Sequence, residues 1–178
     1  MWHQCDVQRQ GLPSGFTGDP FFSCTDSRLF PNNQNCPTNS SGYYLVGNKC
    51  IYHEKTQLTW DNAKKGCQDK FSGGGRLYEP LSLQEHNDVH AIIEPLNTRD
   101  AFWIGVDDLS QEGSFTYSSS GSKISMNLPW YGQGFSGTRG SCCNCVLLND
   151  GKKELDGTKG SWLDYTCTSS YPFVCESE

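Results

Sequence analysis

The sequence lacks the hydrophobic segments of a membrane protein. No stretch approaches the roughly 20 consecutive apolar residues that a membrane-spanning helix needs. The opening residues, Met-Trp-His-Gln-Cys, are not followed by an apolar segment, so they do not form a signal peptide. We interpret Met1 as the start of a mature chain, which leaves open whether a signal peptide or anchor was removed.

Positive charge is scarce and scattered. Lysine and arginine number 14 against 20 aspartates and glutamates, which gives a formal net charge of -6 at pH 7. Runs of basic residues are limited to Lys64-Lys65 and Lys152-Lys153. Because nucleic-acid binding depends on a basic patch that meets the phosphates, this class of partner is excluded.

A recognisable catalytic constellation is also missing from the sequence. It has no Ser-His-Asp order and no nucleophile elbow, and the glycines at 73–75 do not open a helix as a phosphate-binding loop does. His86 and His90 are four residues apart, but Asn87 stands where a metalloprotease H-E-x-x-H motif has its general-base Glu. We interpret both histidines as surface residues and expect no enzymatic activity.

Cysteine, in contrast, is abundant. Ten cysteines in 178 residues are an even number that reducing cytosol would leave as thiols, so we expect a secreted or extracellular chain with about five disulfides. Structural zinc is the competing use, but the cluster Cys142-Cys143-Asn144-Cys145 has no partner knuckle. The N-glycosylation sequon Asn39-Ser40-Ser41 agrees with secretion.

Composition divides the chain near residue 35. Residues 1–35 are rich in Gly, Pro, Asn and Ser and contain Cys5 and Cys24, which indicates a loop-like N-terminal extension. The folded domain is expected over residues 36–178. It begins with two short predicted strands, 43–46 and 50–52, joined at Gly47-Asn48.

Two helices are predicted next. In the first, four apolar residues recur at intervals of three or four and share one face, and the residue before them is a possible N-cap. These residues are Trp60, Ala63, Cys67 and Phe71, preceded by Thr59 and followed by the glycines at 73–75.

The second helix starts with the capping box Ser82-Leu83-Gln84-Glu85 and ends before Pro95. Its inward-facing residues are Val89, Ile92 and Ile93. The remaining predicted elements are strands at 102–106, 114–117, 145–148, 161–162 and 171–175. Between them lies a long segment, 121–141, and a loop of this length inside a compact domain is usually functional.

Three segments resemble the signature of the C-type lectin-like domain. They are Trp103-Ile104-Gly105, Cys145-Val146-Leu147-Leu148, and Gly160-Ser161-Trp162-Leu163-Asp164-Tyr165-Thr166-Cys167 with Cys175 eight residues later. The resemblance covers the chain from about Cys36 to Glu176. It implies an α+β fold with two helices, small antiparallel sheets and a long loop region, with Trp103 and Trp162 in the core.

The resemblance to the long form of this family also implies three disulfides. Carried over residue by residue, they join Cys36 to Cys50, Cys67 to Cys175, and Cys145 to Cys167. Cys5, Cys24, Cys142 and Cys143 remain, and four cysteines allow three connectivities. A bridge from one of them to another chain, giving a disulfide-linked oligomer, stays open.

Calcium-dependent lectins of this family hold a sugar through calcium, using Glu-Pro-Asn or Gln-Pro-Asp in the long loop, a Glu two residues before the strand cysteine, and Trp-Asn-Asp near the end. The matching positions here read Gln133-Gly134-Phe135, Cys143, and Trp162-Leu163-Asp164. Gln133 and Asp164 keep oxygen ligands, but Phe135, Leu163 and Cys143 do not, and the proline is missing. The usual calcium-bridged sugar site is therefore not expected, and Asp164 is interpreted as a hydrogen-bond acceptor in its loop.

Two auxiliary calcium positions of the family match better. Asp108 with Glu112 is one, and Glu85 with Glu176 is the other, with Glu79 nearby. We expect any bound calcium to be structural and to lie at one of these places.

The expected function is that of a secreted recognition module that binds a protein or glycan through the long-loop surface. The ligand-binding candidates are Trp130, Tyr131, Gln133, Phe135, Asp164 and Tyr165, because exposed aromatic rings suit sugar stacking or a protein contact. One alternative is a calcium-dependent carbohydrate-binding lectin with a rearranged site, acting in innate recognition of microbial surfaces. Another is an extracellular structural or matrix protein. Some relatives bind ice, but no regular Thr-rich face is visible.

Overall fold

The structure is a computed structural model that describes residues 36–37, 40–96, 101–124, 142–149 and 160–177. The chain divides into two units, Met1–Pro31 and Asn32–Glu178, and the fold described below is that of the second unit. The boundary expected between residues 35 and 36 stays a prediction.

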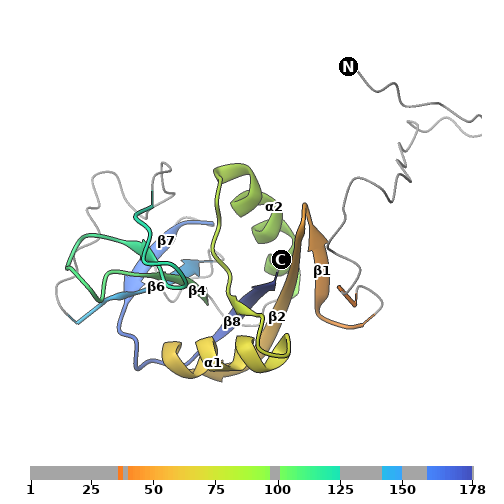
Figure 1. Ribbon diagram of the computed structural model, residues 1–178, viewed down its shortest axis with the longest axis horizontal. Coiled ribbons are helices and arrows are strands. Elements are labelled where there is room, and N and C mark those ends of the chain that lie inside the picture. The colour runs from red at the N-terminus through yellow and green to blue at the C-terminus, as the bar shows by residue number, and fades with distance from the viewer. Residues whose placement is uncertain (1–35, 38–39, 97–100, 125–141, 150–159, 178) are drawn as a thin grey trace, which may run out of the picture. The chain divides into compact units, whose positions relative to one another are not determined.

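One sheet organises the domain, with the strand order β1-β2-β8-β4-β6-β7 and with β3 added to β8 and β5 added to β4. The strands are β1 (Tyr43–Val46), β2 (Lys49–Leu58), β3 (Arg76–Leu77), β4 (Ala101–Asp107), β5 (Thr116–Tyr117), β6 (Cys145–Asn149), β7 (Trp162–Tyr165) and β8 (Tyr171–Ser177). Pairing is antiparallel except between β4 and β8, where Trp103 lies opposite Phe173 in parallel register. Strands from the two ends of the domain, β2 and β8, therefore lie side by side (Figure 1).

The first hairpin forms as predicted but its second strand is longer. Val46 pairs with Lys49, so Gly47 and Asn48 make the two-residue turn, and Gly47 has a φ of 59° that favours glycine. β2 continues to Leu58 instead of ending at Tyr52, because β8 supplies a hydrogen-bonding partner along most of its length.

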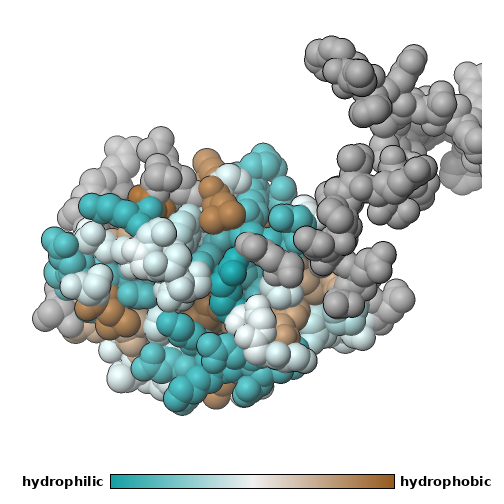
Figure 2. All heavy atoms as spheres, viewed as in Figure 1, coloured by the Kyte–Doolittle hydropathy of each residue, from teal (hydrophilic) through white to brown (hydrophobic). Residues whose placement is uncertain are grey.

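Helix α1 (Trp60–Lys70) buries the predicted face. Trp60, Ala63 and Cys67 are buried, and most of the outward side is hydrophilic (Figure 2). Thr59 occupies the N-cap position, but its side chain makes no capping hydrogen bond, so that part of the prediction is wrong. Phe71 follows the helix and is half-buried.

Helix α2 (Leu83–Ile93) starts at the predicted cap. The backbone N–H of Glu85 donates to Oγ of Ser82 over 3.1 Å. A short 3₁₀ turn, Glu94–Leu96, follows the helix and contains Pro95, which cannot continue the α-helical hydrogen bonds. Val89 and Ile93 are buried as predicted, and Ile92 is half-buried.

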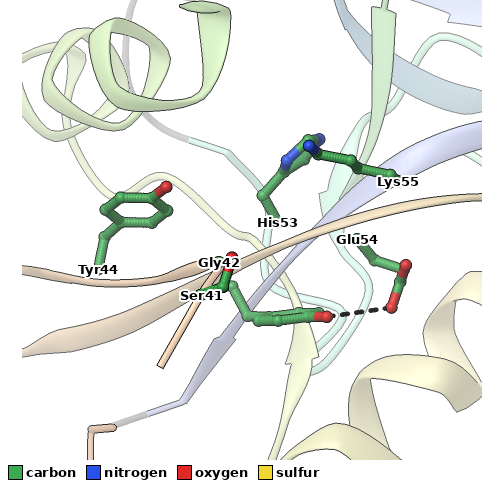
Figure 3. A pocket seen from close by; sticks show the side chains of 7 residues that line it. Ser41, Gly42, Tyr44, His53, Glu54 and Lys55 are labelled. Carbon is green, nitrogen blue, oxygen red and sulfur yellow. Dashed lines mark hydrogen bonds between the residues drawn. The ribbon is translucent and has the colours of Figure 1, made fainter. Parts of the chain in front are cut away.

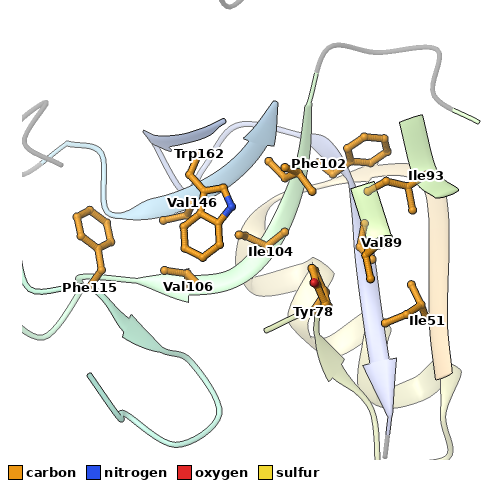
Figure 4. Close-up of a cluster of buried hydrophobic side chains, with 12 residues drawn as sticks. Ile51, Tyr78, Val89, Ile93, Phe102, Ile104, Val106, Phe115, Val146 and Trp162 are labelled. Carbon is orange, nitrogen blue, oxygen red and sulfur yellow. The ribbon is translucent and has the colours of Figure 1, made fainter. Parts of the chain in front are cut away.

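The two helices cover opposite faces of the sheet. Successive residues of a strand point to opposite sides, so neighbouring residues of β4 pack against different helices. On β4, Phe102, Ile104 and Val106 join the cluster that packs against α2 (Figure 4). Trp103 belongs to the other cluster, which packs against α1. Trp103 and Trp162 are both fully buried, as predicted.

All three predicted disulfides are confirmed. They join Cys36 to Cys50, Cys67 to Cys175, and Cys145 to Cys167. The second of them ties α1 to β8 across a sequence separation of 108. No helix among the described residues is long and apolar enough to cross a membrane.

Candidate functional site: a lysine between two carboxylates

The structure describes part of the predicted site. Trp130, Tyr131, Gln133 and Phe135 lie outside the described residues, so their binding role stays a prediction. The described candidates fall into two groups: the carboxylates near α2 and β8, and the carboxylates on β7 and in the loop after β4 together with Tyr165.

Glu85 and Glu176 do come together, but around a lysine. Lys49 extends from the start of β2, and its Nζ lies 2.8 Å from Oε1 of Glu85 and 2.9 Å from Oε2 of Glu176. The same ammonium donates to the carbonyl oxygen of Glu79 over 2.8 Å. The Lys49 side chain is 3% exposed and that of Glu176 is fully buried. The ammonium thus occupies the space between the two carboxylates.

Arg76 adds a second cation to Glu176. Its Nε lies 2.8 Å from Oε1 of Glu176 and 3.7 Å from Oε2 of Glu79. Burial raises the pKa of Glu176, while Lys49 and Arg76 act in the opposite direction by stabilising the charged form. The Glu79 carboxylate also accepts hydrogen bonds from Ser119, through its backbone N–H at 2.8 Å and its Oγ at 2.6 Å.

The residues around Lys49 do not fit the calcium expected at Glu85 and Glu176. Calcium takes six to eight oxygen ligands, and here the three oxygens that converge already bind an ammonium with its three donors. Within the described part of the chain, no three His, Cys, Asp or Glu side chains gather in a way that could hold a metal ion.

The two carboxylates of the second predicted calcium pair differ in burial, and calcium binding there stays a prediction. Asp108 is 1% exposed, and its Oδ2 accepts the backbone N–H of Gly113 over 2.7 Å, whereas Glu112 is exposed. Burial raises the pKa of Asp108, and the negative charge of Asp164 raises it further. Asp108 therefore lies near Asp164 on β7, a neighbour that sequence spacing did not indicate.

Leu163 and Asp164, two positions of the sugar-site pattern that the structure describes, are buried. Leu163 is 1% exposed and belongs to the core cluster around Trp103, and Asp164 is fully buried. Tyr165 is half-buried, and its ring packs edge-on against Tyr171 at 5.6 Å. Asp164 and Tyr165 were both predicted to bind ligand, but Asp164 is enclosed by the domain and Tyr165 packs against a neighbouring ring.

His86 and His90 are buried, so their interpretation as surface residues is wrong. Their rings stack at 6.2 Å, and Nε2 of His86 lies 2.8 Å from the carbonyl oxygen of Gly160. The indole N–H of Trp162 donates to Nδ1 of His86 over 3.2 Å, so the neutral ring donates through Nε2. Burial lowers the pKa of His86. The pair thus joins α2 to the start of β7.

A separate hollow of about 250 Å³ lies along β1 and β2. Its lining includes Tyr44, His53 and Lys55, with His53 and Lys55 on the same side of β2 (Figure 3). On the other side, the hydroxyl of Tyr52 donates to Oε2 of Glu54 over 3.2 Å. None of the predicted site residues lines this hollow.

An α+β domain of two helices on one sheet, with paired first and last long strands and the three disulfides above, defines the C-type lectin-like class. The family profile described as "Lectin C-type domain" matches residues 56–177, and the chain belongs to this family.

Individual relatives agree with this assignment. Lithostathine-1 of Mus musculus is 32% identical over 143 residues, which cover 79% of this chain and 78% of that protein. The type-2 ice-structuring protein of Hemitripterus americanus is 27% identical over 158 residues, covering 88% of this chain and 86% of that protein. The crystal structure of human lithostathine superposes with a TM-score of 0.65 at 25% identity, covering 90% of this chain and 99% of that one.

Proposed function

We propose that this C-type lectin-like domain is a secreted recognition module that binds an extracellular protein or glycan without a calcium-bridged sugar. The observation that carries the proposal is the burial of Asp164 beside the core residue Leu163. A carboxylate enclosed by the core does not reach a sugar hydroxyl in solvent, and Leu163 supplies no oxygen ligand.

Secretion is supported by the disulfides, because three cross-links of this kind persist in oxidising compartments and are rare in the cytosol. The ligand surface remains the one proposed from sequence, formed by Trp130, Tyr131, Gln133 and Phe135. We propose no enzymatic activity, in keeping with lectin-like relatives.

The test is an array of glycans and extracellular proteins, probed with the full chain in millimolar calcium and again in chelator. Equal signals in both conditions are expected. Phe135→Ala should weaken binding to any ligand found, by about 1 to 2 kcal/mol if the ring is buried in the complex. Leu81→Ala is the matched control, because Leu81 is 59% exposed just before the N-cap of α2 and its loss should not affect binding.

Retention on mannose or galactose resin in calcium, with release by chelator, is the opposing result. It would establish a calcium-dependent lectin with a rearranged site instead.

Ice binding is a second candidate, favoured by the match to the ice-structuring protein over most of both chains. Thermal hysteresis of the purified chain decides it. A freezing point depressed below the melting point would support ice as the ligand, and equal temperatures would remove this candidate.

A further inference from the structure

His53 is a buried polar side chain whose Nε2 has no hydrogen-bond partner among the residues that the structure describes. The residue lies on β2 and is 4% exposed. Two contacts fix its position, because its backbone N–H donates to the carbonyl of Gly42 over 3.0 Å and its ring packs edge-on against Phe102 at 5.0 Å. Buried polar atoms in folded proteins nearly always have a partner, so this nitrogen indicates that a further polar group binds beside it.

Lys55 places a positive charge on the same side of β2 as His53 (Figure 3). It is exposed, and none of the ion pairs among the described residues includes it. Glu54 also lines the hollow, but its carboxylate lies on the other side of the strand and accepts hydrogen bonds from Tyr52 and Thr56. The charge of the Lys55 ammonium is therefore available to an anion.

The hollow beside these two side chains has room for a small group. Its volume is about 250 Å³, whereas a water molecule takes about 30 Å³ of the liquid. Ser41 and Tyr44, whose hydroxyls can donate hydrogen bonds, also line it. The lining thus combines several hydrogen-bond donors with one positive charge, which is the combination that an anion needs.

We propose that this hollow binds a small oxyanion, a carboxylate, sulfate or phosphate group, between the Lys55 ammonium and Nε2 of His53. Hydrogen bonds from these two groups to the anion would give the buried nitrogen its partner and offset the charge of the lysine. The stem of Lys55 is flexible, so its ammonium can move aside to admit the anion to the ring. This inference is independent of the ligand proposed for the long loop.

The experiment follows the ring resonances of His53 by NMR in the full chain while sodium acetate, sulfate or phosphate is added at constant ionic strength. We expect a saturable shift with at least one of the three salts, and the salt that acts identifies the oxyanion. Binding should also raise the pKa of His53 from its free value of about 4, because an anion beside the ring stabilises the protonated form.

Lys55→Ala should weaken the affinity for the same salt by about threefold to tenfold, because it removes the positive charge of the site. Lys65→Ala is the matched control, since Lys65 is exposed on α1 and does not line the hollow, and it should bind as wild type does. Shifts that rise linearly with every salt would show an adventitious ion only and would overturn the proposal. Equal affinities of wild type and Lys55→Ala, or equal losses in the two lysine variants, would overturn it as well.

Discussion

At the scale of single residues, His53 shows how burial sets a pH limit on the fold. The imidazole is 4% exposed on β2 and packs edge-on against Phe102 at 5.0 Å. Burial lowers its pKa to about 4, and the neighbouring positive charge of Lys55 adds to that effect, opposed by Glu54. The folded protein therefore holds His53 neutral at a pH where the unfolded chain binds a proton.

The sign of the pH dependence follows from that difference. Since the unfolded pKa is about 6.5, the stabilisation is complete above that value and is lost as pH falls from there to about 4. The loss amounts to roughly 3 kcal/mol at most. Urea unfolding of wild type and His53→Gln at pH 7 and pH 4.5 measures it, and the variant should lose less stability on acidification. Equal losses in the two proteins would contradict this assignment.

Sequence patterns predicted the apolar residues of the core better than the charged ones. Trp103 and Trp162 lie in segments whose resemblance to the family signature implies burial, and both are buried. Lys49 could not be predicted in this way, because lysine is ordinarily exposed and its partner Glu85 is 36 positions away in the chain. Only the fold brings the three oxygens together, and the same holds for the burial of His86 against Gly160.

At the scale of elements, the glycine of the Trp-Ile-Gly segment is fixed by a close approach. The backbone N–H of Gly105 donates to the carbonyl of Tyr78 over 2.8 Å. A Cβ at this position would lie 2.7 Å from the carbonyl oxygen of Leu77 and 2.7 Å from Cγ of Glu79. The strand β3 before this segment was not predicted, because two residues carry no periodicity and tertiary pairing with β8 forms it.

Gly105→Ala should therefore destabilise the domain by about 1 to 3 kcal/mol, since the backbone that it meets cannot move aside freely. Gly74→Ala is the control, because its added Cβ would meet nothing closer than the Phe71 carbonyl oxygen at 3.6 Å. Guanidinium unfolding of both variants checks the ranking. Equal midpoints would show that the strand β4 and the segment after β3 do not need their close contact.

At the scale of the whole molecule, the disulfides differ in how much chain each constrains. The bridge from Cys67 to Cys175 has a sequence separation of 108, and the bridge from Cys36 to Cys50 has one of 14. The chain-entropy account gives about 4 to 5 kcal/mol for the long loop and roughly 3 kcal/mol for the short one. Replacing Cys67 and Cys175 by Ala should thus cost more stability than replacing Cys36 and Cys50, as measured by guanidinium unfolding, and the reverse order would contradict the account.

We propose that the folded domain of this C-type lectin family member does not need calcium for its stability. Thermal melting of the unmodified chain in millimolar calcium and in chelator tests this proposal most directly. A native-state ion at a hundredfold excess over its dissociation constant would add about 2.7 kcal/mol, or roughly 5 to 10 °C at this chain length. We predict the same melting temperature in both conditions, because Lys49 already supplies the charge between Glu85 and Glu176. A rise of several degrees in calcium that chelator reverses would contradict the claim.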